Sequence, residues 1–291
     1  MVEKFNLKSN IPDTNDNNMD LSKEFRNMAL AMFVGYKALS MNETPVACIV
    51  IDNRSDEIIS IGYNYTNNSL NGTKHAEFIA MKRLVDQGVD LSNVTMYVTV
   101  EPCIMCGSFL RQLGLGEVIF GCGNDRFGGN GTVLSVHDDG NLPGKGYASY
   151  GGIMRTEAIQ LLRNFYIQEN DSAPVPQVKK NKDIDSKSFP DNNIVISKDD
   201  FVHKYGSERL FVYEDKSLEL TPILNQGYLI RNIITLEDVQ AIPFMEQEMG
   251  PTDQRQLDEF YDLFFSIDEN GKVDFTNLAS VYNSKKRHLE E

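Results

Sequence analysis

A short set of potential metal ligands constrains this chain more than any other feature. His75 is followed by Glu77, and later in the chain Pro102 precedes a Cys-x-x-Cys pair, Cys103 and Cys106. One imidazole and two thiolates leave a fourth position open on a tetrahedral zinc ion, which is typical of catalytic zinc, whereas a structural zinc usually has four protein ligands. The pattern therefore predicts a catalytic zinc ion bound by His75, Cys103 and Cys106.

The spacing of these residues also predicts how the backbone presents them. Cys103 and Cys106 are three residues apart and share one face of a helix, whose first turn tolerates Pro102 because no backbone N–H is needed there. His75 and Glu77 are two residues apart, so they can serve one pocket only from a helix end. We therefore expect two helix N-termini to converge on the ion, where their dipoles favour thiolates.

Acid–base catalysis explains Glu77, which is left over once the three ligands are assigned. Zinc lowers the pKa of a bound water from about 16 to about 7. A nearby carboxylate can then move protons between that water, a ring nitrogen and a leaving amine, and this motif is the signature of zinc deaminases that act on nucleobases. Two alternatives are a purely structural zinc and a redox pair of Cys103 and Cys106, although a redox pair leaves His75 and Glu77 without a role.

The order of apolar patterns predicts an α/β fold with helices packed on a sheet. Apolar residues recur at helical spacing from residue 21 to 39 and indicate a helix with one apolar face, capped by Asp20 or Ser22. The other expected elements are a hairpin of strands 46–51 and 58–62, helices 75–87, 103–113 and 153–166, and strands 94–100 and 117–121. A glycine-rich loop covers residues 121–131.

Composition divides the chain into four predicted parts. Residues 1–19 are polar and are expected to form a disordered tail, residues 20–169 a folded domain, residues 170–192 a linker with prolines and lysines, and residues 193–291 a small, acidic, partly helical C-terminal extension. In that extension, residues 268–275 resemble half of an EF-hand, with Gly271 as the loop glycine. Ser266 would then occupy the first ligand position and Asn277 the position of the bidentate glutamate, which argues against calcium and favours a helix, turn and helix used for packing.

Charge, cysteines and hydropathy bound the surroundings of the protein. The net charge of −14 argues against a nucleic-acid partner, because phosphates attract basic surfaces. Residues 191–291 hold 10 Lys and Arg against 20 Asp and Glu, so most of the acidity lies there and this argument is weaker for the rest of the chain. Cys48 and Cys122 lie in or beside apolar runs and are expected in the core. No segment reaches the roughly 20 apolar residues that cross a bilayer, and no signal peptide is recognised, so we expect an intracellular protein without membrane contact.

The residues around the zinc pattern resemble the cytidine-deaminase-like superfamily and, within it, the catalytic subunits of eukaryotic tRNA-specific adenosine deaminases. The resemblance covers roughly residues 20–210 and is carried by segments 43–48, 75–78, 91–108, 118–136 and 155–170. All deaminases of this fold share the zinc motif, whereas segment 127–135 and the helix of segment 155–170 point to the tRNA enzymes. The resemblance implies a three-layer α/β/α fold with a mostly mixed central sheet, a Zn²⁺ cofactor and a nuclear and cytoplasmic location.

The resemblance also implies a reaction and partners. The expected activity is hydrolysis of adenosine to inosine at the wobble position of tRNA anticodons, in a heterodimer with a paralogous subunit that lacks the catalytic glutamate. Asn64 matches an asparagine that binds the flipped base, and Val46 and Ala47 match the backbone lining its pocket. A cytidine, dCMP or guanine deaminase acting on free nucleosides, nucleotides or bases is the alternative, because the same zinc ligands serve all of these enzymes.

Two basic clusters are candidates for contacts outside the pocket. Lys179, Lys180, Lys182 and Lys187 lie in the predicted linker, where they are possible contacts for RNA phosphates. A second cluster at residues 285–287 is a weaker candidate for RNA and is also typical of a nuclear-targeting patch. Charge runs are otherwise often solvated surface.

Overall fold

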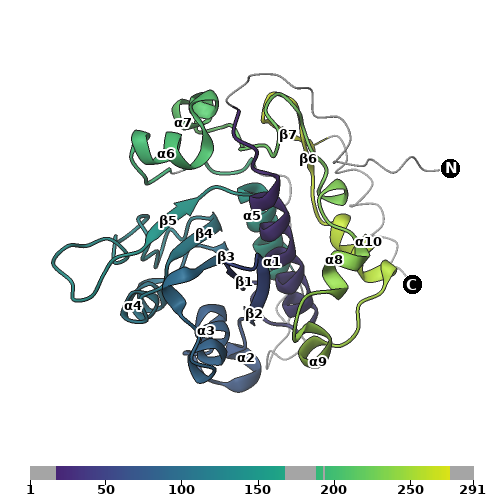
Figure 1. Ribbon diagram of the computed structural model, residues 1–291. Coiled ribbons are helices and arrows are strands. Elements are labelled where there is room, and N and C mark those ends of the chain that lie inside the picture. The colour runs from purple at the N-terminus through teal and green to yellow at the C-terminus, as the bar shows by residue number, and fades with distance from the viewer. Residues whose placement is uncertain (1–17, 168–187, 193, 276–291) are drawn as a thin grey trace.

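Five strands form the central sheet of the computed structural model, which describes residues 18–167, 188–192 and 194–275 (Figure 1). The strand order is β2-β1-β3-β4-β5. These strands are β1 Ala47–Asp52, β2 Glu57–Tyr63, β3 Val94–Val100, β4 Glu117–Cys122 and β5 Ala148–Gly151. β1 is antiparallel to β2 and β3, whereas β3, β4 and β5 run parallel, so the sheet is mixed as predicted.

The predicted strands are confirmed, and β5 is an addition. The predicted hairpin forms, with Ala47 opposite Tyr63 and Asp52 opposite Glu57. β5 contains the sequence Ala-Ser-Tyr-Gly, which carries no apolar alternation, and it pairs with β4 at the edge of the sheet. A strand this short and polar gives no sequence signal of its own.

Helices cover both faces of the sheet, which confirms the predicted three-layer arrangement. α1 Ser22–Ser40 and α5 Arg155–Ile167 pack on one face, and α3 Ala76–Asp86 and α4 Ile104–Gln112 lie on the other, with the short α2 Thr66–Ser69 before α3 (Figure 1). Side chains alternate across β1, because Ile49 belongs to the core beneath α1 and Val50 to the core beneath α3.

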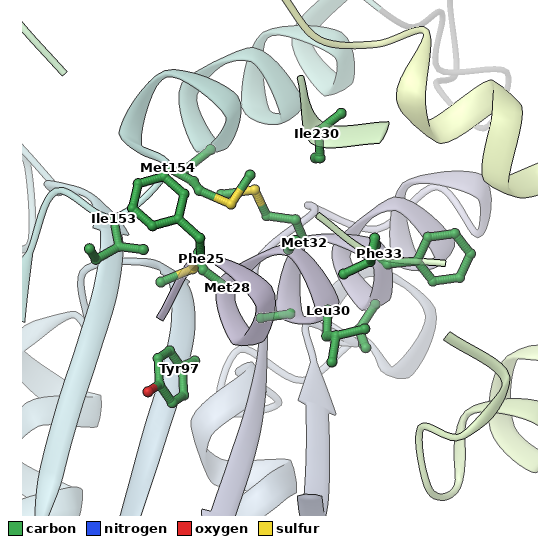
Figure 2. Close-up of a cluster of buried hydrophobic side chains, with 14 of the residues drawn as sticks. Phe25, Met28, Leu30, Met32, Phe33, Tyr97, Ile153, Met154 and Ile230 are labelled. Atoms are coloured by element: carbon green, nitrogen blue, oxygen red, sulfur yellow. The ribbon is translucent and has the colours of Figure 1, made fainter. Parts of the chain in front are cut away.

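The prediction of one apolar face for α1 is wrong, because the helix is buried on all sides from Asn27 to Leu39. Figure 2 shows side chains of α1 packed with Tyr97 of β3 and Met154 near the start of α5, and with Ile230 from the later part of the chain. Phe33 meets Phe260 with ring centroids 5.2 Å apart, and the Tyr36 hydroxyl donates a 2.9 Å hydrogen bond to Glu259. The segment after residue 188 therefore covers the side of α1 that faces away from the sheet. The predicted cap by Asp20 or Ser22 is wrong, because Leu21 is the N-cap residue of α1 and no side-chain cap hydrogen bond forms. The backbone N–H of Ser22 donates to Asp20 just before the helix.

The C-terminal extension consists of short elements. They are α6 Lys198–Tyr205, α7 Leu210–Glu214, α8 Leu236–Gln240, α9 Met245–Met249, α10 Gln254–Tyr261, β6 Ser266–Ile267 and β7 Val273–Asp274, with 3-10 turns at Ser207–Arg209 and Ile230–Asn232. Figure 1 shows α8 and α10 on the opposite side of α1 from the sheet. A buried ion pair between Arg155 and Glu219 also joins this segment to α5. The proposed four-part division of the chain stays a prediction.

The segment that resembles half of an EF-hand forms a hairpin of β6 and β7 after α10. Asp268 Oδ1 accepts the backbone N–H groups of Asn270 and Lys272, at 2.8 and 2.9 Å, and Gly271 has a φ of 78°. The Asp268 carboxylate therefore stabilises its own turn. The Ser266 hydroxyl donates to Asp274 across the hairpin, while Asn277 and the helix expected after the turn lie outside the described residues.

Several predictions fall on residues that the structure does not describe. These are nearly all of the tail 1–19, most of the linker 170–192 with Lys179, Lys180, Lys182 and Lys187, and the basic cluster 285–287. Among the described residues, no helix is both long and apolar enough to span a membrane.

Candidate metal centre and active site

Two helix N-termini meet at the predicted zinc ligands. His75 is the residue before α3 and has extended backbone angles, and Cys103 has the same position before α4. Cys106 lies in the first turn of α4 and is fully buried. The predicted convergence of two helix starts is therefore confirmed, and the positive ends of both helix dipoles point at this place.

The geometry of the three side chains fits a tetrahedral zinc ion. His75 Nδ1 lies 3.6 Å from Cys103 Sγ and 3.4 Å from Cys106 Sγ, and all three atoms lie within 4.8 Å of one another. Zinc bonds of about 2.3 Å to sulfur and about 2.0 Å to nitrogen, at tetrahedral angles, place nitrogen and sulfur about 3.5 Å apart. The donor set and the two nitrogen–sulfur distances therefore fit a zinc site.

The hydrogen bonds within this cluster favour the ionised form of one thiol. The hydrogen bond with Cys106 lowers the pKa of Cys103 to about 4, and the nearby imidazole of His75 contributes to the same shift. The hydrogen bond with Cys103 in turn raises the pKa of His75 above its usual value. A thiolate is the form of cysteine that binds metals, so the site is suited to a cation.

Glu77 lies beside the three ligands and is not one of them. It occupies the first turn of α3, only 2% of its surface is exposed, and burial raises the pKa of its carboxyl group above the usual value. Its Oε2 atom has no hydrogen-bond partner among the described residues. A buried carboxylate oxygen without a partner is costly in a purely structural role, whereas a substrate or water in the pocket would satisfy it.

Asn64 connects the end of β2 to the start of α3. Its side-chain Oδ1 atom accepts a 3.1 Å hydrogen bond from the backbone N–H of Ala76. The backbone N–H of Asn64 donates to the Val46 carbonyl at 2.9 Å. Ala47 is buried, and its N–H donates to Thr99 Oγ1. The structure therefore brings Asn64 and the Val46–Ala47 backbone together beside His75, whereas a simple turn residue would lie in solvent.

Sequence reasoning missed two buried carboxylates that organise the loops around this site. Glu101 accepts the backbone N–H groups of Asn124, Asn130 and Thr132 at 2.9 to 3.0 Å, and so holds the glycine-rich loop against the start of α4. Glu43 accepts those of Asn67 and Asn68 from α2. An acidic residue directly after the apolar run of β3 is the only sequence signal for Glu101.

Known proteins match the part of the chain that contains the candidate metal centre. The family model for the cytidine and deoxycytidylate deaminase zinc-binding region matches residues 21–122, which include all three ligands and Glu77. The chain is 45% identical over 157 residues to the tRNA-specific adenosine deaminase subunit tad2 of Schizosaccharomyces pombe, and the match covers 53% of this chain and 40% of that protein. It is 38% identical over 173 residues to tRNA-specific adenosine deaminase 2 of Xenopus laevis, covering 56% of this chain and 97% of that protein.

A solved structure from studies of A-to-I editing by tRNA:A34 deaminases is also similar. The sequence identity is 20%, the TM-score is 0.43, and the match covers 46% of this chain and 97% of that chain. The chain thus spans nearly the full length of the Xenopus relative and two fifths of the S. pombe relative.

Proposed function

Since this chain belongs to the family of tRNA-specific adenosine deaminases, we propose that it hydrolyses adenosine to inosine at the wobble position of tRNA anticodons. The observation that carries the proposal is the buried carboxylate of Glu77, whose Oε2 atom has no hydrogen-bond partner among the described residues, beside three side chains spaced as zinc ligands. A subunit that only stabilises a partner needs the ligands but has no need of this carboxylate. We therefore propose that this chain is the catalytic subunit.

The proposed reaction replaces the amino group on C6 of the purine with oxygen from water, and ammonia leaves. His75, Cys103 and Cys106 would hold a zinc ion, which would make a bound water acidic enough to react at neutral pH. Glu77 accepts one proton from the attacking water and delivers it to N1 of the ring. It then transfers the second proton, from the new hydroxyl on C6, to the amino group, so that ammonia leaves as the C6–N bond breaks. Burial of Glu77 supports this cycle, because it raises the pKa of the carboxyl group and so makes the carboxylate a stronger proton acceptor.

We further propose that Asn64, Val46 and Ala47 recognise the flipped adenine. The Oδ1 atom of Asn64 is used by Ala76, which fixes the orientation of the amide and leaves its Nδ2 group as the donor toward a purine edge. Val46 is half-buried next to the site, and its backbone segment is held by Asn64 and Thr99. The fixed amide provides directional recognition of one base.

A paralogous subunit is the proposed protein partner. The S. pombe relative is itself described as a subunit. Between α3 and α4, Phe78 and Phe109 stack with ring centroids 4.0 Å apart in an open apolar hollow that Val85 and Leu113 also line. We propose that the partner covers this surface, which lies on the outer side of the two helices that carry the metal ligands. The linker residues Lys179, Lys180 and Lys182 remain proposed RNA contacts, and the nucleus and cytoplasm remain the proposed location.

A substrate comparison tests the proposed function. The copurified chain and partner are assayed on an anticodon stem-loop with adenosine at the wobble position, and on free adenosine, cytidine and guanine. We expect inosine in the stem-loop and no ammonia from the free compounds. Deamination of a free nucleoside or base in preference to the stem-loop would contradict the proposal and favour the small-molecule alternative.

A further inference from the structure

The loop between β4 and β5 exposes three apolar side chains close together. Phe127 is 61% exposed, Leu134 50% and Val133 44%. The backbone N–H of Leu134 donates to the Gly128 carbonyl at 3.0 Å, so Leu134 lies beside the residue that follows Phe127. Clustered exposed apolar residues on a protein surface are typical of a contact site.

This cluster lies next to the metal centre. The Phe127 carbonyl accepts a 2.8 Å hydrogen bond from the N–H of Ile104, the first residue of α4. Gly128 forms a β-bridge with Cys103, and the N–H of Gly129 donates to the Pro102 carbonyl. Phe127 is therefore connected through the backbone to the segment that presents a metal ligand.

The loop is held rigidly although its aromatic ring is exposed. Asn124 Oδ1 accepts the N–H of Phe127 at 3.1 Å, and Glu101 accepts three further backbone N–H groups of the loop. Gly128 packs so closely on Glu101 that a Cβ atom there would lie 2.4 Å from Oε2. A rigid loop loses little conformational entropy when it binds, so it is suited to hold the ring in a fixed place.

We propose that Phe127 and Leu134 form a stacking surface for the unpaired nucleobase next to the target adenosine. The inference rests on the proposed function and deepens it. Unpaired bases in RNA loops are commonly bound by stacking on aromatic side chains. The charges of the loop favour this contact over one to phosphate, because Asp125 and Arg126 are its only charged residues between 123 and 136 and cancel each other. Stacking also requires no positive charge from a chain whose net charge is −14.

The test combines protein and RNA substitutions. The full chain with its partner deaminates the stem-loop under single-turnover conditions, as wild type, Phe127→Ala, Phe127→Tyr and Phe211→Ala. Phe211 of α7 is also an exposed phenylalanine, at 41%, and serves as the matched control. We expect Phe127→Ala to lower kcat/KM by about 5- to 150-fold, while Phe127→Tyr and Phe211→Ala retain activity and all variants keep their zinc content.

An abasic nucleotide on either side of the adenosine identifies the base. We expect one of the two abasic substitutions to cost the wild type as much as Phe127→Ala does, and to cost the variant nothing more, because the same contact has already been removed. Unchanged kinetics for Phe127→Ala, or losses that add, would overturn the proposal. So would weaker association of Phe127→Ala with the partner at full activity of the assembled complex, which would make the cluster a protein contact.

A binding measurement separates this inference from the proposed function. A stem-loop with 2-aminopurine at the identified flanking position is titrated with each variant, without turnover. Fluorescence quenching by wild type and Phe127→Tyr, and its absence with Phe127→Ala, supports stacking even where the stem-loop is not deaminated. Equal quenching by wild type and Phe127→Ala overturns the stacking surface and leaves the proposed reaction to be judged by the substrate comparison alone.

Discussion

Asn64 Oδ1 accepts the backbone N–H of Ala76, so the residue proposed to bind the base also fixes the first turn of the helix that follows the metal ligand His75. The two roles use different atoms of one amide, because Oδ1 faces the helix and Nδ2 remains as a donor. Substitutions at this position can therefore separate base recognition from support of the helix.

We expect Asn64→Ala to lower kcat/KM on the stem-loop. The loss should correspond to about 1 to 3 kcal/mol of transition-state stabilisation, because a buried hydrogen bond is lost. Asn64→Asp is the matched variant, since it keeps an oxygen for Ala76 and removes the Nδ2 donor. Asn64→Asp with low activity and a normal melting temperature supports base recognition. Wild-type activity in Asn64→Asp would contradict base recognition and show that Asn64 only supports the start of the helix.

Glu77→Gln is expected to abolish deamination with zinc still bound. The carboxylate moves protons and is not a ligand, and glutamine has nearly its shape but cannot exchange a proton. Metal analysis by mass spectrometry and a stem-loop assay on the same preparation check both halves. Either loss of stoichiometric zinc or substantial remaining turnover contradicts the assigned role.

Cys103→Ala and Cys106→Ala are each expected to lose zinc and part of the protein's solubility. Each variant leaves the ion with two protein ligands, and metal binding contributes directly to the stability of the folded domain. Zinc content and the yield of soluble protein are measured together. Cys48→Ala is the control, because Cys48 is also buried but belongs to the core beneath α3. A Cys103→Ala variant with full zinc content would exclude Cys103 as a ligand.

Stability is expected to fall as the pH rises through about 7 because of Glu157. This carboxyl is buried, accepts a 2.7 Å hydrogen bond from the Tyr228 hydroxyl, and has its pKa raised to about 7 mainly by burial. The folded protein holds this proton more tightly than the unfolded chain does. Its contribution to the free energy of unfolding is therefore complete below pH 4.5 and is lost as the pH rises through 7. Two charged residues also act on the Glu157 carboxyl: the charge of Glu219 raises its pKa and the charge of Arg155 lowers it.

Urea unfolding of wild type and Glu157→Gln between pH 5 and pH 8 measures this contribution. The free energy of unfolding should decline less steeply with pH in Glu157→Gln, whereas Glu237→Gln, at an exposed glutamate of α8, should follow the wild type. Parallel curves for wild type and Glu157→Gln would show that Glu157 does not titrate in this range.

The isolated chain is expected to bind tRNA weakly, with the partner subunit supplying most of the cationic surface. Even outside the acidic C-terminal part, residues 1–190 hold 18 Lys and Arg against 22 Asp and Glu, and attraction of a polyanion requires positive charge in the assembly. Each neutralised phosphate steepens the slope of log affinity against log salt concentration by slightly less than one. Affinity against salt is measured for the chain, the partner and their mixture. A chain that matched the mixture in affinity and slope would contradict the heterodimer proposal.

Local patterns in the sequence predict the sheet and the metal centre well. β1 is a short apolar run and β3 an alternating pattern of the right length. The positions of His75 and Cys103 at two helix starts follow from spacing alone. The contacts of Glu101 were not predictable in this way, because its partners lie more than 20 residues later and are backbone groups. Burial of α1 on all sides was missed for the same reason, since the residues that cover it are in short elements without a clear period.

The position of α1 between the sheet and the C-terminal extension has a consequence for biosynthesis. Tyr36 and its partner Glu259 are 223 residues apart in the chain, and a ribosome adds about 5 to 20 residues per second. The first helix therefore waits roughly 11 to 45 seconds for the segment that covers its outer side. During that interval an apolar surface stays open on the nascent chain, so we expect chaperones to bind this protein during translation more strongly than they bind short deaminases without the extension.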